Sequence, residues 1–133
     1  MKKTFLDTNI IAYNYDDAEP DKCLFISDLL VTVERNISTQ VFSELANLLS
    51  KKFKFSWSAI AAAHSELNAN FTLHLVTAHT IAKAVSLAER YKYSYYDSLI
   101  LASAIEAQCE ILYSEDFQHN QLIEGVRIIN PFL

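Results

Sequence analysis

Glycine is almost missing from this chain of 133 residues: Gly125 is the only one, and Pro20 and Pro131 are the only prolines. So few turn-forming residues leave little room for flexible linkers or for a fold built from many tight turns, and they favour a helix-rich chain. Cysteine is scarce as well. Cys23 and Cys109 show no motif spacing, which favours reduced core thiols over a disulfide.

Long apolar runs are also missing. No stretch is long enough to cross a bilayer, and no segment combines the charged start, apolar core and cleavage site of a signal peptide. We therefore expect a cytoplasmic protein that makes no membrane contact. A chain of 133 residues, with 51% hydrophobic and 20% charged residues, fits one globular domain that covers residues 1–133.

Basic residues are outnumbered by acidic ones, 11 to 16, for a net charge of −5. This balance lacks the basic footprint usual in nucleic-acid-binding proteins. One basic cluster is present, and it is interleaved with aromatic residues: Lys51, Lys52, Phe53, Lys54, Phe55 and Trp57. A phosphate-and-base platform is one interpretation of the cluster, but we expect the solvated end of a helix.

Apolar periodicity and capping residues predict strands that alternate with helices along the chain. Strands are expected at about 2–6, 36–38, 71–76, 111–113 and 126–129. Helices are expected at about 8–13, 20–33, 39–52, 56–68, 77–91 and 94–108. This alternation predicts a three-layer α/β/α fold around a central, mostly parallel five-stranded sheet.

Four acidic residues occupy positions that a packed α/β domain avoids. Asp7 directly follows one predicted strand and Asp116 comes three residues after the end of another, where open parallel sheets place their ligands. Glu44 lies about one turn inside a predicted helix, between the apolar residues Val41 and Leu48 on the same face. Asp97 lies in the first turn of another helix. We expect all four carboxylates at one edge of the sheet.

Each acid also has a simpler explanation. Asp7, Asp97 and Asp116 can cap the elements that follow them, and Ser94-Tyr95-Tyr96-Asp97 has the form of a capping box. Glu44 is not at a cap position, so a partly buried salt bridge is its main alternative role.

Charge repulsion argues for a cation if the four acids converge. Two like charges 4 Å apart repel by roughly 4 kcal/mol at an effective dielectric of 20, and a domain is stable by only about 5–15 kcal/mol. Oxygen ligands without histidine or cysteine at ligand spacing favour Mg²⁺ or Mn²⁺ over zinc. Without these four acids the net charge is −1, so the overall charge is a weak objection to a nucleic-acid substrate.

Four stretches resemble the PIN-domain nuclease family and, within it, the VapC-type ribonuclease toxins. They are Phe5-Leu6-Asp7-Thr8-Asn9, Phe42-Ser43-Glu44-Leu45, Tyr95-Tyr96-Asp97-Ser98-Leu99-Ile100-Leu101-Ala102 and Tyr113-Ser114-Glu115-Asp116. The tail from Ile123 to Phe132 is similar to a common ending in that group, although Asn120 stands where related tails often have glycine. Asn suits a tight turn there nearly as well.

The resemblance implies a Mg²⁺- or Mn²⁺-dependent endoribonuclease, the toxin of a toxin–antitoxin pair. It implies that Asp7, Glu44, Asp97 and Asp116 form the catalytic and metal-binding quartet, supported by Thr8, Asn9 and Ser114. The implied partners are an RNA substrate, a cognate antitoxin and a second copy of the chain in a homodimer. Some of the apolar surface of the early helices (Tyr13, Tyr15, Leu24 and Phe25) is either core or such an interface.

Other interpretations remain open. The chain is alternatively a catalytically idle PIN-like interaction module. An aspartyl-phosphate phosphatase, in which Asp7 is the nucleophile, ranks low because the second aspartate expected two residues later is Asn9. Glu115 is an auxiliary ligand or, as we expect, simply exposed. Four tyrosines near Asp97 are expected mostly to pack, with one or two at the site for base stacking: Tyr91, Tyr93, Tyr95 and Tyr96.

Overall fold

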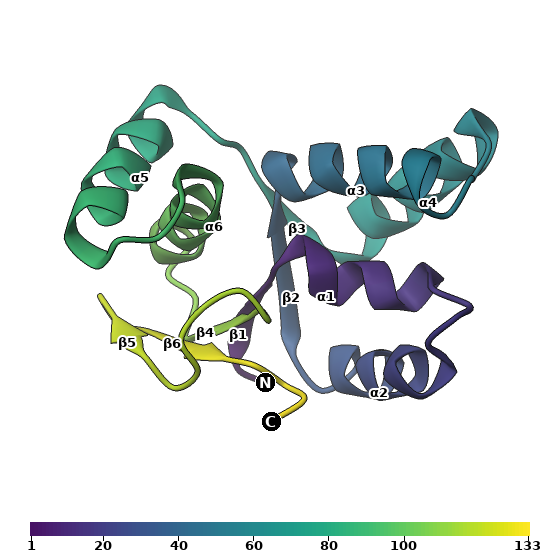
Figure 1. Cartoon of the computed structure of the whole chain (residues 1–133), viewed down its shortest axis with the longest axis horizontal. Helices are drawn as coiled ribbons and strands as arrows, with labels where there is room; N and C mark the ends of the chain where they lie inside the picture. The colour runs from purple at the N-terminus through teal and green to yellow at the C-terminus, as the bar shows by residue number, and fades with distance from the viewer.

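A sheet between two groups of helices makes up the computed structural model, which describes residues 1–133 (Figure 1). On one side lie helices α1 (Thr8–Ala12), α2 (Pro20–Leu30), α3 (Thr39–Lys51) and α4 (Trp57–Asn70), with a 3₁₀ turn η1 (Tyr13–Tyr15) after α1. On the other side lie α5 (Ala78–Tyr91) and α6 (Tyr95–Glu106). The predicted three-layer α/β/α class is confirmed.

The sheet has six strands in the order β3-β2-β1-β4-β6-β5. They are β1 (Lys3–Leu6), β2 (Glu34–Ser38), β3 (Thr72–His74), β4 (Ile111–Tyr113), β5 (Leu122–Ile123) and β6 (Val126–Ile129). All neighbouring strands are parallel except β5 and β6. Helices connect β1 to β2, β2 to β3 and β3 to β4, whereas β4 reaches its parallel neighbour β6 through a loop and β5.

The prediction of five strands was wrong, because β5 is a sixth. It forms a hairpin with β6 through Glu124 and Gly125, whose φ angles are 47° and 87°. Two central residues with positive φ match the type I′ turn that suits the twist of paired strands, and glycine adopts such angles without strain. Asn120 also has a positive φ of 69°, which agrees with the tight turn expected there.

Strand register brings two parts of the predicted site together. Leu6 at the end of β1 pairs with Tyr113 at the end of β4. The next residues, Asp7 and Ser114, therefore leave the sheet side by side, and the Asp7 N–H donates to the Tyr113 carbonyl at 3.0 Å. The carboxyl ends of the central strands thus form the edge at which the acids were expected.

Polar side chains set the starts of the long helices. Ser38, Ser56, Thr77 and Ser94 each accept a hydrogen bond from a backbone N–H in the first turn of the helix that follows. These N-caps stabilise a helix end by about 1 kcal/mol each. They fix where α3 and α6, which carry Glu44 and Asp97, begin.

Helix α6 forms the centre of one layer. All residues from Ser98 to Ala104 are buried, so the middle of this helix is enclosed on all sides, whereas Tyr95 and Tyr96 in its first turn are exposed. Cys109 is buried and Cys23 is partly buried, and neither forms a disulfide. None of the helices combines the length and apolar character that crossing a bilayer requires.

Candidate active site

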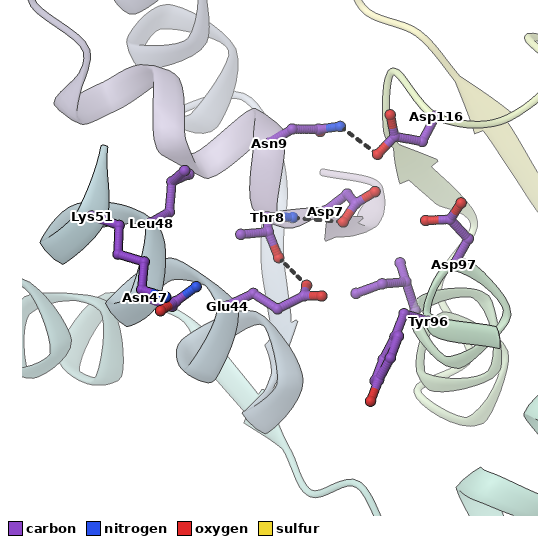
Figure 2. Close-up of a pocket in the computed structure, with 11 residues that line it drawn as sticks. Asp7, Thr8, Asn9, Glu44, Asn47, Leu48, Lys51, Tyr96, Asp97 and Asp116 are labelled. Carbon is purple, nitrogen blue, oxygen red and sulfur yellow. Dashed lines mark hydrogen bonds between the residues drawn. The ribbon is translucent and has the colours of Figure 1, made fainter. Parts of the chain in front are cut away.

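A pocket of about 420 Å³ opens at the carboxyl ends of β1 and β4 (Figure 2). Its walls come from the start of α1, the middle of α3, the start of α6 and the loop after β4. The lining residues are Asp7, Thr8, Asn9, Glu44, Asn47, Leu48, Lys51, Tyr96, Asp97, Ile100 and Asp116. All four predicted acids therefore share one pocket.

Asp7 is the most deeply placed of the four, with 4% of its surface exposed. One carboxylate oxygen, Oδ1, accepts from the Thr8 N–H at 2.7 Å and caps α1. The other, Oδ2, accepts from the Ser114 hydroxyl at 2.6 Å. Burial raises the pKa of Asp7 to about 7, although both hydrogen bonds oppose this shift. The capping role considered from sequence is thus real, and it leaves the carboxylate facing the pocket.

Asp116 and Asp97 stand nearer to solvent. The Asn9 amide donates to Asp116 Oδ2 at 2.9 Å, and burial and then the charge of Asp97 raise the pKa of Asp116. Burial raises the pKa of Asp97, and the charge of Glu44 adds to the shift. Ser94 accepts from the Asp97 N–H at 3.2 Å, so the serine caps α6.

Glu44 reaches the pocket from α3 without forming a salt bridge. None of the three ion pairs of the chain includes it. Its Oε1 accepts from the Thr8 hydroxyl at 2.7 Å, and its Oε2 accepts from the Gln40 amide at 3.4 Å. The partly buried salt bridge considered from sequence is therefore absent, and the negative charge of Glu44 has no cationic partner.

The three predicted supporting residues each donate to a different acid. Thr8 donates to Glu44, Asn9 to Asp116, and Ser114 to Asp7. The Ser114 oxygen also accepts from the Asp116 N–H at 3.1 Å, which links two acids through one hydroxyl. Hydrogen bonds of this kind fix the rotamers of carboxylates that bind a metal.

The donor set fits a hard divalent cation. One oxygen each from Asp7, Asp97 and Asp116 lies within 4.8 Å of the others. This spread is close to the roughly 4.2 Å that separates opposite ligands of Mg²⁺, each about 2.1 Å from the ion. The buried Oδ1 of Asn9 also lacks a hydrogen-bond partner in this pocket. Glu44 lies outside the group of three, beside it on α3 (Figure 2).

Several neighbours have roles that the sequence left open. Tyr96 lines the pocket, whereas the hydroxyl of Tyr93 bonds to the Gln118 N–H and its ring packs on Phe117. Glu115 accepts from the Tyr13 hydroxyl at 2.7 Å and does not line the pocket. Of the lysine cluster, Lys51 lies in the pocket wall.

Two further residues of α3 were not predicted at the site. Asn47 lines the pocket, and Gln40 bonds to Glu44 and to the Tyr96 carbonyl, the latter at 3.0 Å. Their spacing from Glu44, four residues before it and three after it, places them on its face of the helix. This helical spacing was the signal in the sequence from which Gln40 and Asn47 could have been predicted at the site.

The early helices mix core with exposed apolar surface. Tyr13 and Tyr15 pack against the core, whereas Leu24 and Phe25 of α2 are 66% and 46% exposed. A hollow of about 430 Å³ lies beside Phe25 and the C-terminal Phe132.

Comparisons with known proteins agree with this architecture. The family model of the PIN domain matches residues 4–123. No curated protein matches the chain at a significant level. Among solved structures, the chain is similar to a toxin–antitoxin complex from Klebsiella pneumoniae, with 22% identity, a TM-score of 0.70, and coverage of 96% of this chain and 97% of that one.

Two further structures show the same likeness. One is VapC20 from Mycobacterium tuberculosis, described as a toxin that cleaves the sarcin-ricin loop, with 23% identity, a TM-score of 0.72, and coverage of 93% and 98%. The other is VapBC2 from Rickettsia felis bound to a DNA fragment of its promoter, with 18% identity, a TM-score of 0.66, and coverage of 94% and 96%. At these identities the likeness establishes the fold.

Proposed function

The chain belongs to the PIN-domain family, and on this premise we propose that it is a divalent-metal-dependent endoribonuclease and the toxin of a toxin–antitoxin pair. The observation that carries the proposal is the convergence of oxygens from Asp7, Asp97 and Asp116, three distant parts of the chain, with Glu44 in the same pocket. A single nuclease domain then spans residues 1–133. The similar VapC20 is described as a toxin that cleaves the sarcin-ricin loop, which supports RNA as the substrate here.

The residues divide the work by position. Asp7, Asp97 and Asp116 would hold Mg²⁺ or Mn²⁺, and a cation there supplies activation of a water molecule and neutralises charge on the phosphodiester. Glu44, outside that group and held by the Thr8 hydroxyl, is placed to orient the attacking water or to accept its proton. Ser114 holds Asp7 in place and Asn9 holds Asp116.

Cleavage of single-stranded RNA by the purified protein tests this proposal. We expect cleavage with Mg²⁺ or Mn²⁺ and none with EDTA. The products should carry a 5′-phosphate and a 3′-hydroxyl, because water and not the 2′-hydroxyl attacks the phosphorus and the 3′-oxygen leaves. Products with 2′,3′-cyclic phosphate ends, or cleavage that persists in EDTA, would contradict it.

Neighbouring acids provide a matched pair of variants. Asp116→Asn should lower the cleavage rate by more than about 100-fold, since it removes a metal ligand. Glu115→Gln removes the same charge one residue earlier, but Glu115 contacts Tyr13 outside the pocket, so cleavage should persist. Equal cleavage rates for the two variants would contradict the metal-ligand role of Asp116, and absence of cleavage by the wild type would favour the idle interaction module.

The partners are part of the same proposal. The similarity to structures of toxin–antitoxin complexes supports a cognate antitoxin, and the exposed Leu24 and Phe25 support a homodimer interface on α2. Expression in bacterial cells should arrest growth, and Asp97→Asn should relieve the arrest. Sequencing of RNA 5′ ends from cells expressing the wild type and Asp7→Asn would identify the RNA that is cut.

A further inference from the structure

One face of α3 lines both the acidic pocket and a second hollow beside it. Gln40, Ser43, Glu44, Asn47, Leu48 and Lys51 follow the spacing of a single helix face, and each of them lines the acidic pocket or a second hollow of about 280 Å³. Glu44 and Tyr96 line both hollows, so the two are continuous. The face extends about 16 Å along the helix axis. We call these six residues the α3 face.

Lys51 marks one end of the α3 face. It is the only basic residue that lines the acidic pocket, and none of the three ion pairs of the chain includes it. It lies seven positions after Glu44, about 10 Å along the axis, so this acid does not neutralise it at short range. The exposed Asn47 lies between them, and Figure 2 shows Lys51 and Tyr96 on opposite sides of Glu44. The ammonium group of Lys51 is therefore free to bind an anion.

Tyr96 of α6 lies beside the other end of the α3 face, at Gln40. Tyr96 is 64% exposed, and its ring forms an edge contact with the Tyr95 ring, with centroids 5.1 Å apart. Gln40 holds the start of α6 against α3 by donating to the Tyr96 carbonyl at 3.0 Å. The second hollow, beside Tyr96, has apolar walls from Val76 and Leu99. Its polar lining is Thr39, Gln40, Ser43 and Glu44. An apolar wall with a polar rim suits a nucleobase, which has apolar faces and polar edges.

We propose that the α3 face and Tyr96 of α6 together bind a single strand of RNA across the acids. This inference rests on the proposed ribonuclease function and adds which residues hold the substrate on each side of the cleaved bond. Lys51 binds a phosphate on one side, and Tyr96 stacks on a base on the other side. A duplex is a poor ligand because its bases are already stacked within the helix and cannot reach Tyr96.

Fluorescence anisotropy with a labelled single-stranded RNA of mixed sequence tests this inference. Binding is measured with Mn²⁺ in the Glu44→Gln background, which prevents cleavage and keeps the three aspartates that would hold the ion, and over a range of salt concentrations. Lys51→Gln should weaken binding severalfold and lower the slope of log affinity against log salt by about 0.7, the value for one phosphate contact on a single strand. Tyr96→Ala should weaken binding by about 5- to 150-fold with no change in slope, since a stack and not a charge is lost.

Three controls make these effects specific. Lys51→Arg should keep the salt slope, and Tyr96→Phe should keep the affinity, because charge and ring are retained. Lys2→Gln removes the same charge at the opposite end of β1 and should change neither quantity. A blunt duplex of the same length should bind at least about tenfold more weakly than the single strand. Lys51 and Tyr96 are exposed, so their variants should melt at the temperature of the parent protein.

The inference is wrong if Lys51→Gln behaves like Lys2→Gln, if Tyr96→Ala behaves like Tyr96→Phe, or if the duplex binds as tightly as the single strand. Cleavage by the wild-type protein, assayed in parallel, separates the two proposals. Cleavage that persists alongside any of these results overturns only the binding role of the α3 face. Absence of both RNA binding and cleavage overturns the proposed function as well.

Discussion

Burial distinguishes Asp7 from the other acids of the pocket. It is almost fully buried, whereas Asp97 is partly buried and Asp116 is exposed. Burial is the largest cause of its raised pKa, ahead of the charges of Asp116 and Glu44. A group that titrates near pH 7 is neutralised by a proton below that pH, and above it the protein must bear a buried charge or bind a cation.

The metal-free protein should therefore lose stability as the pH rises from about 4 to about 7. Asp7 has a pKa of about 7 in the folded protein against 3.8 in the reference state, so in this window the folded state holds more protons than the unfolded state. The loss is a few kcal/mol at most, at about 1.4 kcal/mol per pKa unit. Asp7→Asn should lack this loss. Urea unfolding in EDTA at pH 5 and pH 8 measures it, and parallel pH profiles for the two proteins would contradict the assigned pKa.

Ser114 is the residue whose single hydroxyl touches two acids. Ser114→Ala removes the hydrogen bond to Asp7 and the acceptor for the Asp116 N–H. We expect Mn²⁺ affinity to fall by about 10- to 100-fold, the usual cost of losing a group that orients a metal ligand. Titration calorimetry measures this loss. Ser103→Ala is the matched control, because Ser103 is equally buried but its hydroxyl has no partner and lies outside the acidic pocket. Equal affinities for the two variants would exclude the role given to Ser114.

Among the elements, α6 shows how one helix start serves both stability and the site. Ser94 caps the helix, and the adjoining turn presents Asp97 to the pocket. The two functions thus belong to different side chains. The capping-box pattern predicted a capping role for both Ser94 and Asp97, whereas in the structure Ser94 caps the helix and Asp97 lines the pocket.

The two side chains should respond in opposite directions when each is changed in the metal-free protein. Ser94→Ala should cost about 1 kcal/mol of unfolding free energy, because an N-cap is lost. Asp97→Asn should raise the melting temperature, because it removes a carboxylate whose charged form is disfavoured by burial and by the charge of Glu44, as its raised pKa indicates. The same change should abolish cleavage. Thermal melts in EDTA measure both. A loss of more than about 1 kcal/mol in Asp97→Asn would mean that its carboxylate acts mainly as a cap.

Local sequence was sufficient to predict the long elements and insufficient for the shortest. Ser38, Thr77 and Ser94 marked helix starts because a cap acts within its own turn. Strand β5 was missed because two residues show no periodicity, and only Gly125 beside them indicated a hairpin. Asp7 and Asp116 were located because they follow strands, whose ends share one edge.

The roles of Lys51 and Gln40 could not be predicted in this way. Lys51 lines the acidic pocket and Gln40 lines the second hollow, because α3 packs against α1 and bonds to the start of α6. These contacts are tertiary and cannot be derived from local sequence. The helix face shared with Glu44 indicated only that they were candidates.

For the whole molecule, the fold concentrates negative charge that the sequence disperses. Residues 7, 44, 97 and 116 meet in one pocket because parallel strands end at one edge and helices α3 and α6 start beside it. The cluster accounts for most of the net charge of −5. An anionic substrate can approach such a pocket only if cations offset its charge.

Anomalous diffraction from crystals grown with Mn²⁺ tests the central claim, that these carboxylates hold a divalent ion. We expect an anomalous peak among the side chains of Asp7, Asp97 and Asp116, with each contributing an oxygen to the ion. The account would be contradicted by crystals at millimolar Mn²⁺ that show no anomalous peak in this pocket, or that show a Mn²⁺ ion only at another place in the protein.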